Sequence, residues 1–192
     1  MKLVFATNNK NKIKEIKQLL DNSLEILSLE DIGCTEDIPE TSDTIKGNAI
    51  QKAEYVYDKY GYNCFADDTG LEIEALNGEP GIYSARYAGE QKNAEDNMNK
   101  VLEKLDGNNN RTAQFITIIT LIIDGKITCF EGVAEGEMTT QKSGSEGFGY
   151  DPIFKPNGYE ITFSEMNLEL KNKISHRAKA TFKLIDYLKQ VQ

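Results

Sequence analysis

The sequence predicts an α/β protein with a mixed β-sheet and flanking helices. In the first half of the chain, short apolar runs typical of buried strands alternate with stretches whose apolar residues recur at helical spacing. In the second half, two long β-branched and aromatic runs flank Asp124-Gly125, a strong signal for a β-hairpin. Alternating strands and helices followed by a hairpin favour a sheet with both parallel and antiparallel strands.

The individual elements follow from these patterns. Strands are expected at 2–7, 24–29, 63–66, 71–75, 111–123 and 126–138. Helices are expected at 12–20, from capping candidates at 41–43 to about Tyr60, at 93–105, at 167–173 and at 175–190. Gly61 should end the second helix, and the two hairpin strands are long enough to form a protruding ribbon.

Composition narrows the function classes. Of the 192 residues, 39% are apolar and 28% are charged, which is ordinary for a globular protein. No apolar stretch approaches the ~18 residues of a membrane span, and the start of the chain lacks the shape of a signal peptide. The three cysteines include no C-x-x-C pair. We therefore expect no membrane partner, disulfide framework or zinc site, and a cytoplasmic location.

The charge distribution favours a small anionic ligand. A net charge of −9 argues against nucleic-acid polymers, whose phosphate backbones select basic protein faces. Lysines nevertheless crowd the first turn and helix, at positions 2, 10, 12, 14 and 17, and Glu15 is the only acid among them. An acidic protein with one basic pocket suits a small anion better than a polymer.

The chain is organised around residues 63–70, NCFADDTG. We expect the apolar part to be a buried strand that ends at Asp67 and Asp68, because α/β proteins place their chemistry at strand ends. Adjacent carboxylates repel each other, so a fold that holds them together usually supplies a cation, and a divalent metal is the natural candidate. The alternative is a solvated turn, which favours the same residue types.

Two further groups of residues favour a phosphorylated ligand. The run Thr7-Asn8-Asn9-Lys10-Asn11-Lys12 lies between a predicted strand and helix, where N–H and side-chain donors can bind an anion, although the P-loop pattern is absent. Glu40 precedes the second helix and Lys52 lies on it. Together with the Asp pair they would form a Mg²⁺ site with a lysine beside it. Singly, each of these residues is more often a surface group.

Two motifs carry aromatic and cationic side chains. In Phe148-Gly149-Tyr150-Asp151-Pro152 the aromatics can stack on a nucleobase, and the alternative is a strand-entry turn with core aromatics. In Ser175-His176-Arg177, Ser175 is the expected N-cap and His176 is the only histidine, a residue that is usually structural when it stands alone. A cation in the first turn of a helix is unfavourable by roughly 0.3–1 kcal/mol, because the helix dipole is positive there. Arg177 breaks this local rule and is therefore a candidate for function.

Five motifs, in register over essentially the whole chain, resemble the inosine triphosphate pyrophosphatase family. They are Thr7-x-Asn9-x-x-Lys12, Asp67-Asp68-Thr69-Gly70-Leu71, Gly81-Ile82-Tyr83-Ser84-Ala85-Arg86-Tyr87, Gly147-Phe148-Gly149-Tyr150-Asp151-Pro152 and Ser175-His176-Arg177. The resemblance implies a single domain over residues 1–192, with an elongated mixed sheet and two lobes around a central cleft, and usually a homodimer. It implies Mg²⁺-dependent hydrolysis of non-standard purine nucleoside triphosphates (ITP, dITP, XTP) to the monophosphate and pyrophosphate, which cleanses the nucleotide pool.

The resemblance also implies roles for individual residues. Asp68 would be the catalytic proton acceptor, and Glu40 and Asp68 would bind the metal. The triphosphate would be held by Thr7, Asn8, Asn9, Lys10, Asn11, Lys12 and Lys52. Thr69 stands where the family usually has serine, and Asn8 where it usually has glycine. The sugar and purine would be held by Phe148, Gly149, Tyr150, Asp151, Lys171, His176 and Arg177.

Selectivity and alternatives can be stated from the same residues. We hypothesise that donors of His176 or Arg177 meet the purine 6-oxo group, because the 6-amino group of adenine would leave buried donors unpaired. One alternative is a related pyrophosphatase for modified pyrimidines or methylated nucleotides. A haloacid-dehalogenase-type phosphatase is disfavoured because the D-x-D-G-T order is absent. A nucleotide-binding regulator without turnover is the alternative from another class.

Overall fold

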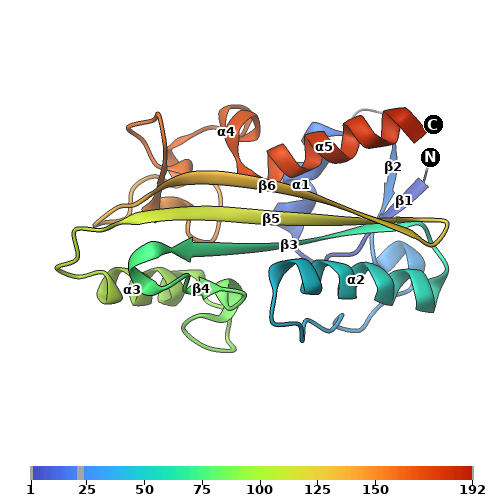
Figure 1. The fold of residues 1–192 in the computed structure, drawn as a ribbon, viewed down its shortest axis with the longest axis horizontal. Coiled ribbons are helices and arrows are strands. Elements are labelled where there is room, and N and C mark those ends of the chain that lie inside the picture. Colours follow the sequence, from blue (N-terminus) through green and yellow to red (C-terminus); the bar gives the residue numbers. More distant parts are fainter. Residues whose placement is uncertain (1, 21–23, 192) are drawn as a thin grey trace. The chain divides into compact units, whose positions relative to one another are not determined.

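A mixed β-sheet runs through the protein, whose computed structural model describes residues 2–20 and 24–191. The strands are β1 (Lys2–Phe5), β2 (Glu25–Leu27), β3 (Cys64–Ile73), β4 (Pro80–Gly81), β5 (Thr112–Ile123), β6 (Lys126–Met138) and β7 (Phe154–Pro156). Their order is β2-β1-β3-β5-β6-β7, and β4 pairs with β3. β1 runs parallel to β2 and β3, whereas β4 and β7 pair antiparallel. The predicted α/β class with a mixed sheet is confirmed (Figure 1).

Helices flank this sheet. They are α1 (Lys10–Leu19), α2 (Ile45–Tyr60), α3 (Ala94–Lys104), α4 (Leu168–Ile174) and α5 (His176–Val191). Single 3₁₀ turns lie at Glu30–Ile32, Glu74–Leu76, Ser84–Arg86, Asp151–Ile153 and Phe163–Glu165. Within the described residues, no helix combines the length and apolar character needed to cross a membrane.

The helices begin and end close to the predicted positions, with two corrections at their starts. α1 begins at Lys10, not at residue 12, because the Asn9 side chain caps it by accepting from two backbone N–H groups. α2 is capped by Thr44, whose side chain accepts from the N–H of Gly47, and not by residues 41–43. Its end at Gly61, which has a left-handed φ of 71°, is as predicted.

The organising stretch was expected to be a strand, a turn and a second strand, and this prediction is wrong. β3 continues without interruption from Cys64 to Ile73, through both aspartates, Thr69 and Gly70. Tertiary contacts override the turn propensity of Asp67 to Gly70, because β3 lies between β1 and β5 and the aspartates have cationic partners. Leu71 and Ile73 are fully buried while Glu72 is partly exposed and Glu74 exposed, so the predicted alternation of this half-exposed stretch is confirmed.

The hairpin of β5 and β6 is confirmed. Asp124 and Gly125 both have positive φ, 49° and 80°, as a two-residue hairpin turn requires. The expected protruding ribbon is wrong, because β5 lies between β3 and β6 inside the sheet. Residues 117–122 of β5 are buried without a break, which is typical of a strand covered on both faces.

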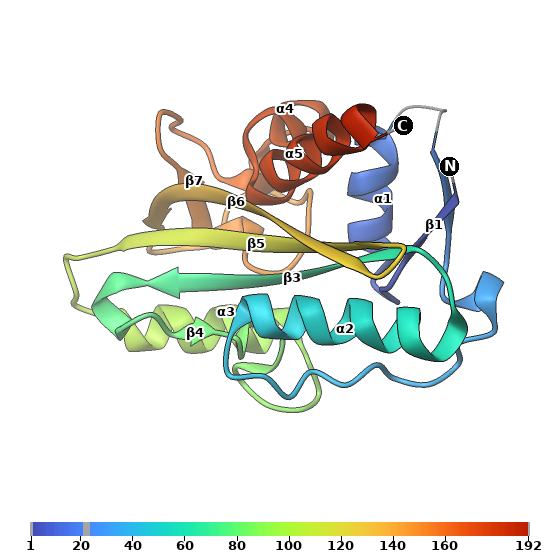
Figure 2. The same ribbon diagram turned by 45° about the vertical axis from the view of Figure 1, so that its right-hand side comes forward.

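The chain groups into two compact units. The first unit comprises the described parts of residues 1–68, 117–132 and 177–192. In it, α2 covers one face of the strands, where Val4, Ala53 and Cys64 meet, whereas α1 and α5 cover the other (Figures 1 and 2). On that second face the rings of Phe5 and Phe65 stack with centroids 4.5 Å apart.

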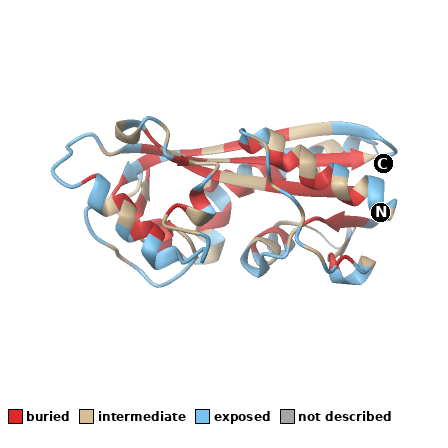
Figure 3. Cartoon of the chain, turned by 90° about the horizontal axis from the view of Figure 1, so that it is seen from below, coloured by how far each residue is buried: buried red, intermediate tan, exposed pale blue. Residues whose placement is uncertain are grey.

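The second unit comprises residues 69–116 and 133–176. Its core joins residues of β3, α3, β5, β6 and β7, with Phe115, Phe154 and Phe163 in mutual ring contact. In both units the strands are buried along much of their length, while the helices keep one exposed side (Figure 3).

Candidate active site

The two aspartates of β3 carry the site, and they point to opposite faces of the sheet. Successive side chains of a strand alternate in direction. Phe65 lies in the core beneath α1 and α5, so Asp67 shares that face, whereas Ala66 lies in the core beneath α2, so Asp68 shares the other. The pair therefore does not act as one doubly charged ligand.

Asp67 is held between two cations. The side chain is 1% exposed. It lies 3.0 Å from Nζ of Lys12 on α1 and 3.2 Å from Nε of Arg177 on α5. Burial by itself would raise the pKa of Asp67, but the charges of Lys12, Arg177 and Lys52 outweigh it and lower the pKa to about 2. Asp67 is thus ionised at neutral pH and already neutralised by protein groups.

Glu15 belongs to the same network, although its function was not predicted from the sequence. Its carboxylate accepts from Nη1 of Arg177 at 2.5 Å, and both side chains are almost fully buried. Burial opposes the charge of Arg177, but Glu15 and Asp67 outweigh it and raise the pKa of the guanidinium. Glu15 lies four residues before the apolar Leu19, so the two side chains share one face of the helix. A carboxylate on that face could have signalled a buried cation.

On the other face, Lys52 connects the two predicted metal ligands. Its Nζ lies 3.2 Å from Oδ1 of Asp68 and also donates to Oε1 of Glu40. Burial favours the neutral amine, but Asp68 and Glu40 outweigh it and raise the pKa of Lys52. Burial also raises the pKa of Asp68, despite the attraction of Lys52 and Lys12. The predicted grouping of Glu40, Lys52 and Asp68 is present in the first unit.

The loop that carries Glu40 is fastened to α2 next to Lys52. The backbone N–H of Thr41 donates to Oε1 of Gln51 at 2.8 Å, and that of Ser42 donates to Oδ1 of Asn48 at 2.9 Å. Asn48 is 2% exposed. From the sequence, Thr41 and Ser42 are predicted only as capping candidates. Their observed contacts hold Glu40 near the lysine.

The predicted anion-binding loop before α1 has a partly different arrangement from the one expected. The backbone N–H groups of Asn11 and Lys12 donate to Oδ1 of Asn9, and the N–H of Asn9 donates to Oγ1 of Thr7. These donors were expected to be available to an anion, and here the loop itself accepts them. Burial lowers the pKa of Lys12, and Asp67 offsets this only in part. Asn8 and Lys10 are exposed and stay predictions as ligands of a phosphate.

The donor set can be tested against the expected magnesium ion. Among the described residues, no group of three or more His, Cys, Asp and Glu side chains is arranged to hold a metal. Mg²⁺ is usually bound through one or two carboxylates together with substrate phosphates and water, not by an all-protein cage. Glu40 and Asp68, which share one lysine, match that requirement. These residues therefore fit the ion.

In the second unit, Asp151 organises the expected base-binding loop. It is 3% exposed, and its Oδ2 accepts from the backbone N–H of Phe148 at 2.8 Å and from Nζ of Lys171 at 2.6 Å. The same Nζ lies 5.0 Å from the ring centroid of Phe148, within the range of a cation–π contact. The structure thus brings together three of the residues assigned to sugar and purine, and leaves Phe148 partly exposed.

The other expected base-binding aromatics are buried. The ring of His176 stacks on Phe115 with centroids 4.5 Å apart, and the residue is 3% exposed. Tyr150 is 5% exposed and belongs to the core of the second unit. For Tyr150, the core-aromatic alternative describes the environment better than stacking on a nucleobase. Direct contact of His176, Gly149 or Thr69 with a substrate stays a prediction.

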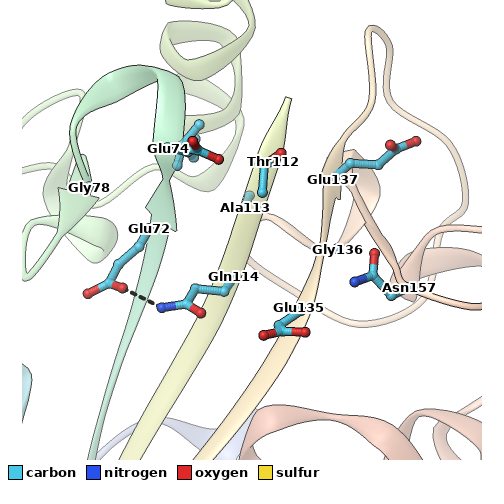
Figure 4. Close-up of a pocket in the computed structure, with 11 residues that line it drawn as sticks. Glu72, Glu74, Gly78, Thr112, Ala113, Gln114, Glu135, Gly136, Glu137 and Asn157 are labelled. Carbon is cyan, nitrogen blue, oxygen red and sulfur yellow. Dashed lines mark hydrogen bonds between the residues drawn. The ribbon is translucent and has the colours of Figure 1, made fainter. Parts of the chain in front are cut away.

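A cavity of about 600 Å³ lies elsewhere in the second unit (Figure 4). Glu72 and Glu74 of the β3 region and Glu135 and Glu137 of β6 line it, and the Gln114 amide donates to Glu72 at 2.8 Å. Four carboxylates would repel a triphosphate. This cavity is therefore not the predicted phosphate site, and it contains none of the predicted site residues.

The sequence and the fold are similar to those of known proteins. The curated dITP/XTP pyrophosphatase of Flavobacterium johnsoniae is 66% identical over 188 residues, covering 98% of each chain. The Ham1 protein of Staphylococcus aureus has a solved structure with a TM-score of 0.92 at 39% identity, covering 100% of each chain. That of Coxiella burnetii reaches 0.92 at 36% identity over 99% of each. The Ham1 family pattern matches residues 3–187, and this chain belongs to the Ham1 family.

Proposed function

We propose that the protein is a nucleoside triphosphate pyrophosphatase that hydrolyses dITP, ITP and XTP to the monophosphate and pyrophosphate with Mg²⁺. The observation that carries this proposal is the position of Lys52, whose Nζ contacts both Glu40 and Asp68. Carboxylates for a cation beside ammonium groups for an anion are what a metal-bound polyphosphate needs. The names of relatives such as the dITP/XTP pyrophosphatase of Flavobacterium johnsoniae support the substrate class.

The first unit would bind the phosphates. Lys52, Lys12 and the Thr7–Lys12 loop would hold the phosphate oxygens, while Glu40 and Asp68 would hold Mg²⁺. The ion would neutralise the charge that develops on the leaving pyrophosphate. Phosphoryl-type transfer depends mainly on positioning and electrostatic stabilisation, which fixed ammonium groups provide without reorganising. Asp67 keeps Lys12 in place through its short contact on the other side of β3.

Asp68 would accept the proton of the attacking water. The oxygen of that water forms a new bond to phosphorus, the bond to the bridging oxygen between the α- and β-phosphates breaks, and the electron pair leaves with pyrophosphate. Burial raises the pKa of Asp68, and a carboxylate of higher pKa is a stronger general base.

Base selectivity is a separate part of the proposal. Phe148, Asp151 and Lys171 would contact the sugar and base, and His176 or Arg177 would influence the purine 6-oxo group. Arg177 also has a structural role, because it lies buried between Glu15 and Asp67 and neutralises their charges. If Arg177→Ala folded normally and kept the preference for ITP over ATP, the assignment of Arg177 to selectivity would be wrong.

Product analysis tests the reaction. The purified protein is incubated with Mg²⁺ and, separately, with ITP, dITP, XTP, ATP and GTP, and the products are separated by anion-exchange chromatography. We expect pyrophosphate and the monophosphate from the first three and little product from ATP or GTP. Orthophosphate as the first product would make the protein a phosphatase. Tight binding without turnover would make it a nucleotide-binding regulator.

An Asp68→Asn variant separates binding from turnover, because the amide keeps the size of the side chain but is a poor base and a weaker metal ligand.

We also propose that the protein is a homodimer in the cytoplasm, as expected from the family resemblance. Light scattering after size-exclusion chromatography measures the mass, and a particle near 21.5 kDa would contradict the dimer.

A further inference from the structure

The motif Gly81–Tyr87 is part of the family resemblance, yet no role was assigned to it. In the structure it follows β4 and forms the 3₁₀ turn Ser84–Arg86 in the second unit. Ser84 is buried, although its neighbours Tyr83 and Ala85 are exposed. A buried serine in an otherwise exposed turn requires hydrogen-bond partners, and those partners show what the turn does.

The Ser84 side chain joins the turn to the sheet. Its Oγ donates to the carbonyl of Gly81 at 2.6 Å and accepts from the backbone N–H of Leu71 at 2.9 Å. Leu71 lies on β3 and is fully buried. Asn97 of α3, 3% exposed, supports the turn from another side by donating to the carbonyl of Ala85 at 3.0 Å. The backbone of Ser84 is therefore fixed from two elements.

The fixed carbonyl of Ser84 accepts the hydroxyl of Tyr150 at 2.7 Å. Tyr150 lies between Gly149 and Asp151, in the loop expected to hold the base. Its ring is packed in the core, and burial raises the pKa of its hydroxyl, so the group remains a donor at neutral pH. This bond connects residues 66 positions apart in the chain. It fixes one end of a loop that is also held by the bonds from Phe148 and Lys171 to Asp151.

We propose that Ser84 and the Tyr150 hydroxyl are positioning residues for base selectivity. They would act through the loop 148–151, and Tyr150 would not touch the substrate. This inference rests on the proposed function, in which Phe148 and Asp151 contact the nucleoside. Recognition of a base edge requires its partners to be held to a fraction of an ångström. Loss of the bond would weaken binding of the preferred base and so reduce discrimination between bases.

The test compares three Tyr→Phe variants, each of which removes one hydroxyl from the same core cluster. Tyr150→Phe removes the bond to Ser84. Tyr87→Phe removes a bond of 2.6 Å to Glu79 and controls for the loss of a hydrogen bond in the second unit. In Tyr159→Phe the hydroxyl lost has no hydrogen bond among the contacts of the described structure, so this variant controls for the substitution itself.

For each variant, kcat/KM is measured for dITP and dATP at a temperature well below the midpoint of thermal unfolding. We expect Tyr150→Phe to lower the dITP/dATP ratio roughly fivefold to tenfold, about the value of one hydrogen bond, mainly through KM for dITP. Both controls should keep the ratio within roughly twofold. Ser84→Ala should lower the ratio at least as much, because it removes both hydrogen bonds by which the Ser84 side chain joins the turn to the sheet.

An unchanged ratio in Tyr150→Phe, or an equal fall in Tyr87→Phe, would overturn the inference. Dissociation constants for dITP and dATP, measured by calorimetry in EDTA, give the same ratio without turnover. If the wild-type protein hydrolyses neither nucleotide, the proposed function fails, while the ratio of dissociation constants still decides the role of Tyr150 and Ser84. A rise in the ratio of the dITP to the dATP dissociation constant for Tyr150→Phe, but not for the two control variants, would support the positioning role.

Discussion

Asp67→Asn should destabilise the protein by about 2 to 4 kcal/mol at neutral pH. The carboxyl pKa falls from its ordinary 3.8 to about 2, and each pKa unit corresponds to about 1.36 kcal/mol. After the opposing cost of burial, the ionised side chain therefore contributes about 2 kcal/mol net at neutral pH. The upper figure allows for two buried cations that lose part of their compensation, since breaking a buried pair costs about 3–5 kcal/mol. Glu15 remains beside Arg177 and limits the loss.

The assay is urea unfolding of the wild type and the variant between pH 7 and pH 3, followed by circular dichroism. Because the folded-state pKa of Asp67 lies below the unfolded-state value, its contribution is complete above about pH 5 and is lost as the pH falls toward 2. The difference between the two proteins should therefore shrink, to roughly half at pH 3.

Glu25→Gln is the matched control. Glu25 forms an ion pair with Lys2, but both side chains are more than half exposed, so its loss should cost less than about 1 kcal/mol. A free energy of unfolding for Asp67→Asn within 0.5 kcal/mol of the wild-type value, or a difference that does not change with pH, would refute the assigned role of the Lys12–Asp67–Arg177 contacts.

Four other predictions concern the proposed reaction. Lys52→Met should lower kcat about 10²–10³-fold, because one preorganised charge is lost; pyrophosphate release measures this, and a change below threefold would contradict it. Phe148→Ala should raise KM for dITP about tenfold or more if a base stacks on this ring, and an unchanged KM would exclude stacking. The rate should fall as the pH drops through the raised pKa of Asp68, because the protonated carboxyl cannot accept a proton from water. Chelation of Mg²⁺ should abolish turnover until Mg²⁺ is restored, and activity retained in excess EDTA would contradict the metal requirement.

Local chemistry made much of the fold predictable. The Asp124-Gly125 hairpin and the end of α2 at Gly61 depend on backbone conformations that a few adjacent residues determine. The course of β3 does not depend on adjacent residues alone. The residues DDTG favour a turn by composition, and they stay in a strand because their partners come from far away, with Lys12 at a separation of 55 residues and Arg177 at 110.

The same distinction applies to the candidate site. Asp68 could be predicted because a recognisable motif carries it, and Glu40 and Lys52 because of their places before and on the helix that precedes it. The structure brings the three together in the first unit. Glu15 was missed, because one acid among lysines looks like a solvated charge until its buried guanidinium partner is known. The hydrogen bond from Tyr150 to the carbonyl of Ser84 could not be predicted at all, because the accepting group belongs to the backbone and has no residue signature.

The alternation along β3 constrains how the gene for this protein can change. Asp67 and Asp68 are chemically identical neighbours, and only the pleat decides which of them neutralises Lys12 and which one contacts Lys52. Insertion or deletion of one codon within β3 would exchange the two faces of every residue beyond it. Many substitutions in this strand alter one contact, whereas a change in its length would turn every following side chain to the opposite face and leave either Lys12 or Lys52 without its carboxylate from β3. We therefore expect a one-residue deletion between Cys64 and Asp67 to abolish folding, even though it removes no charged group.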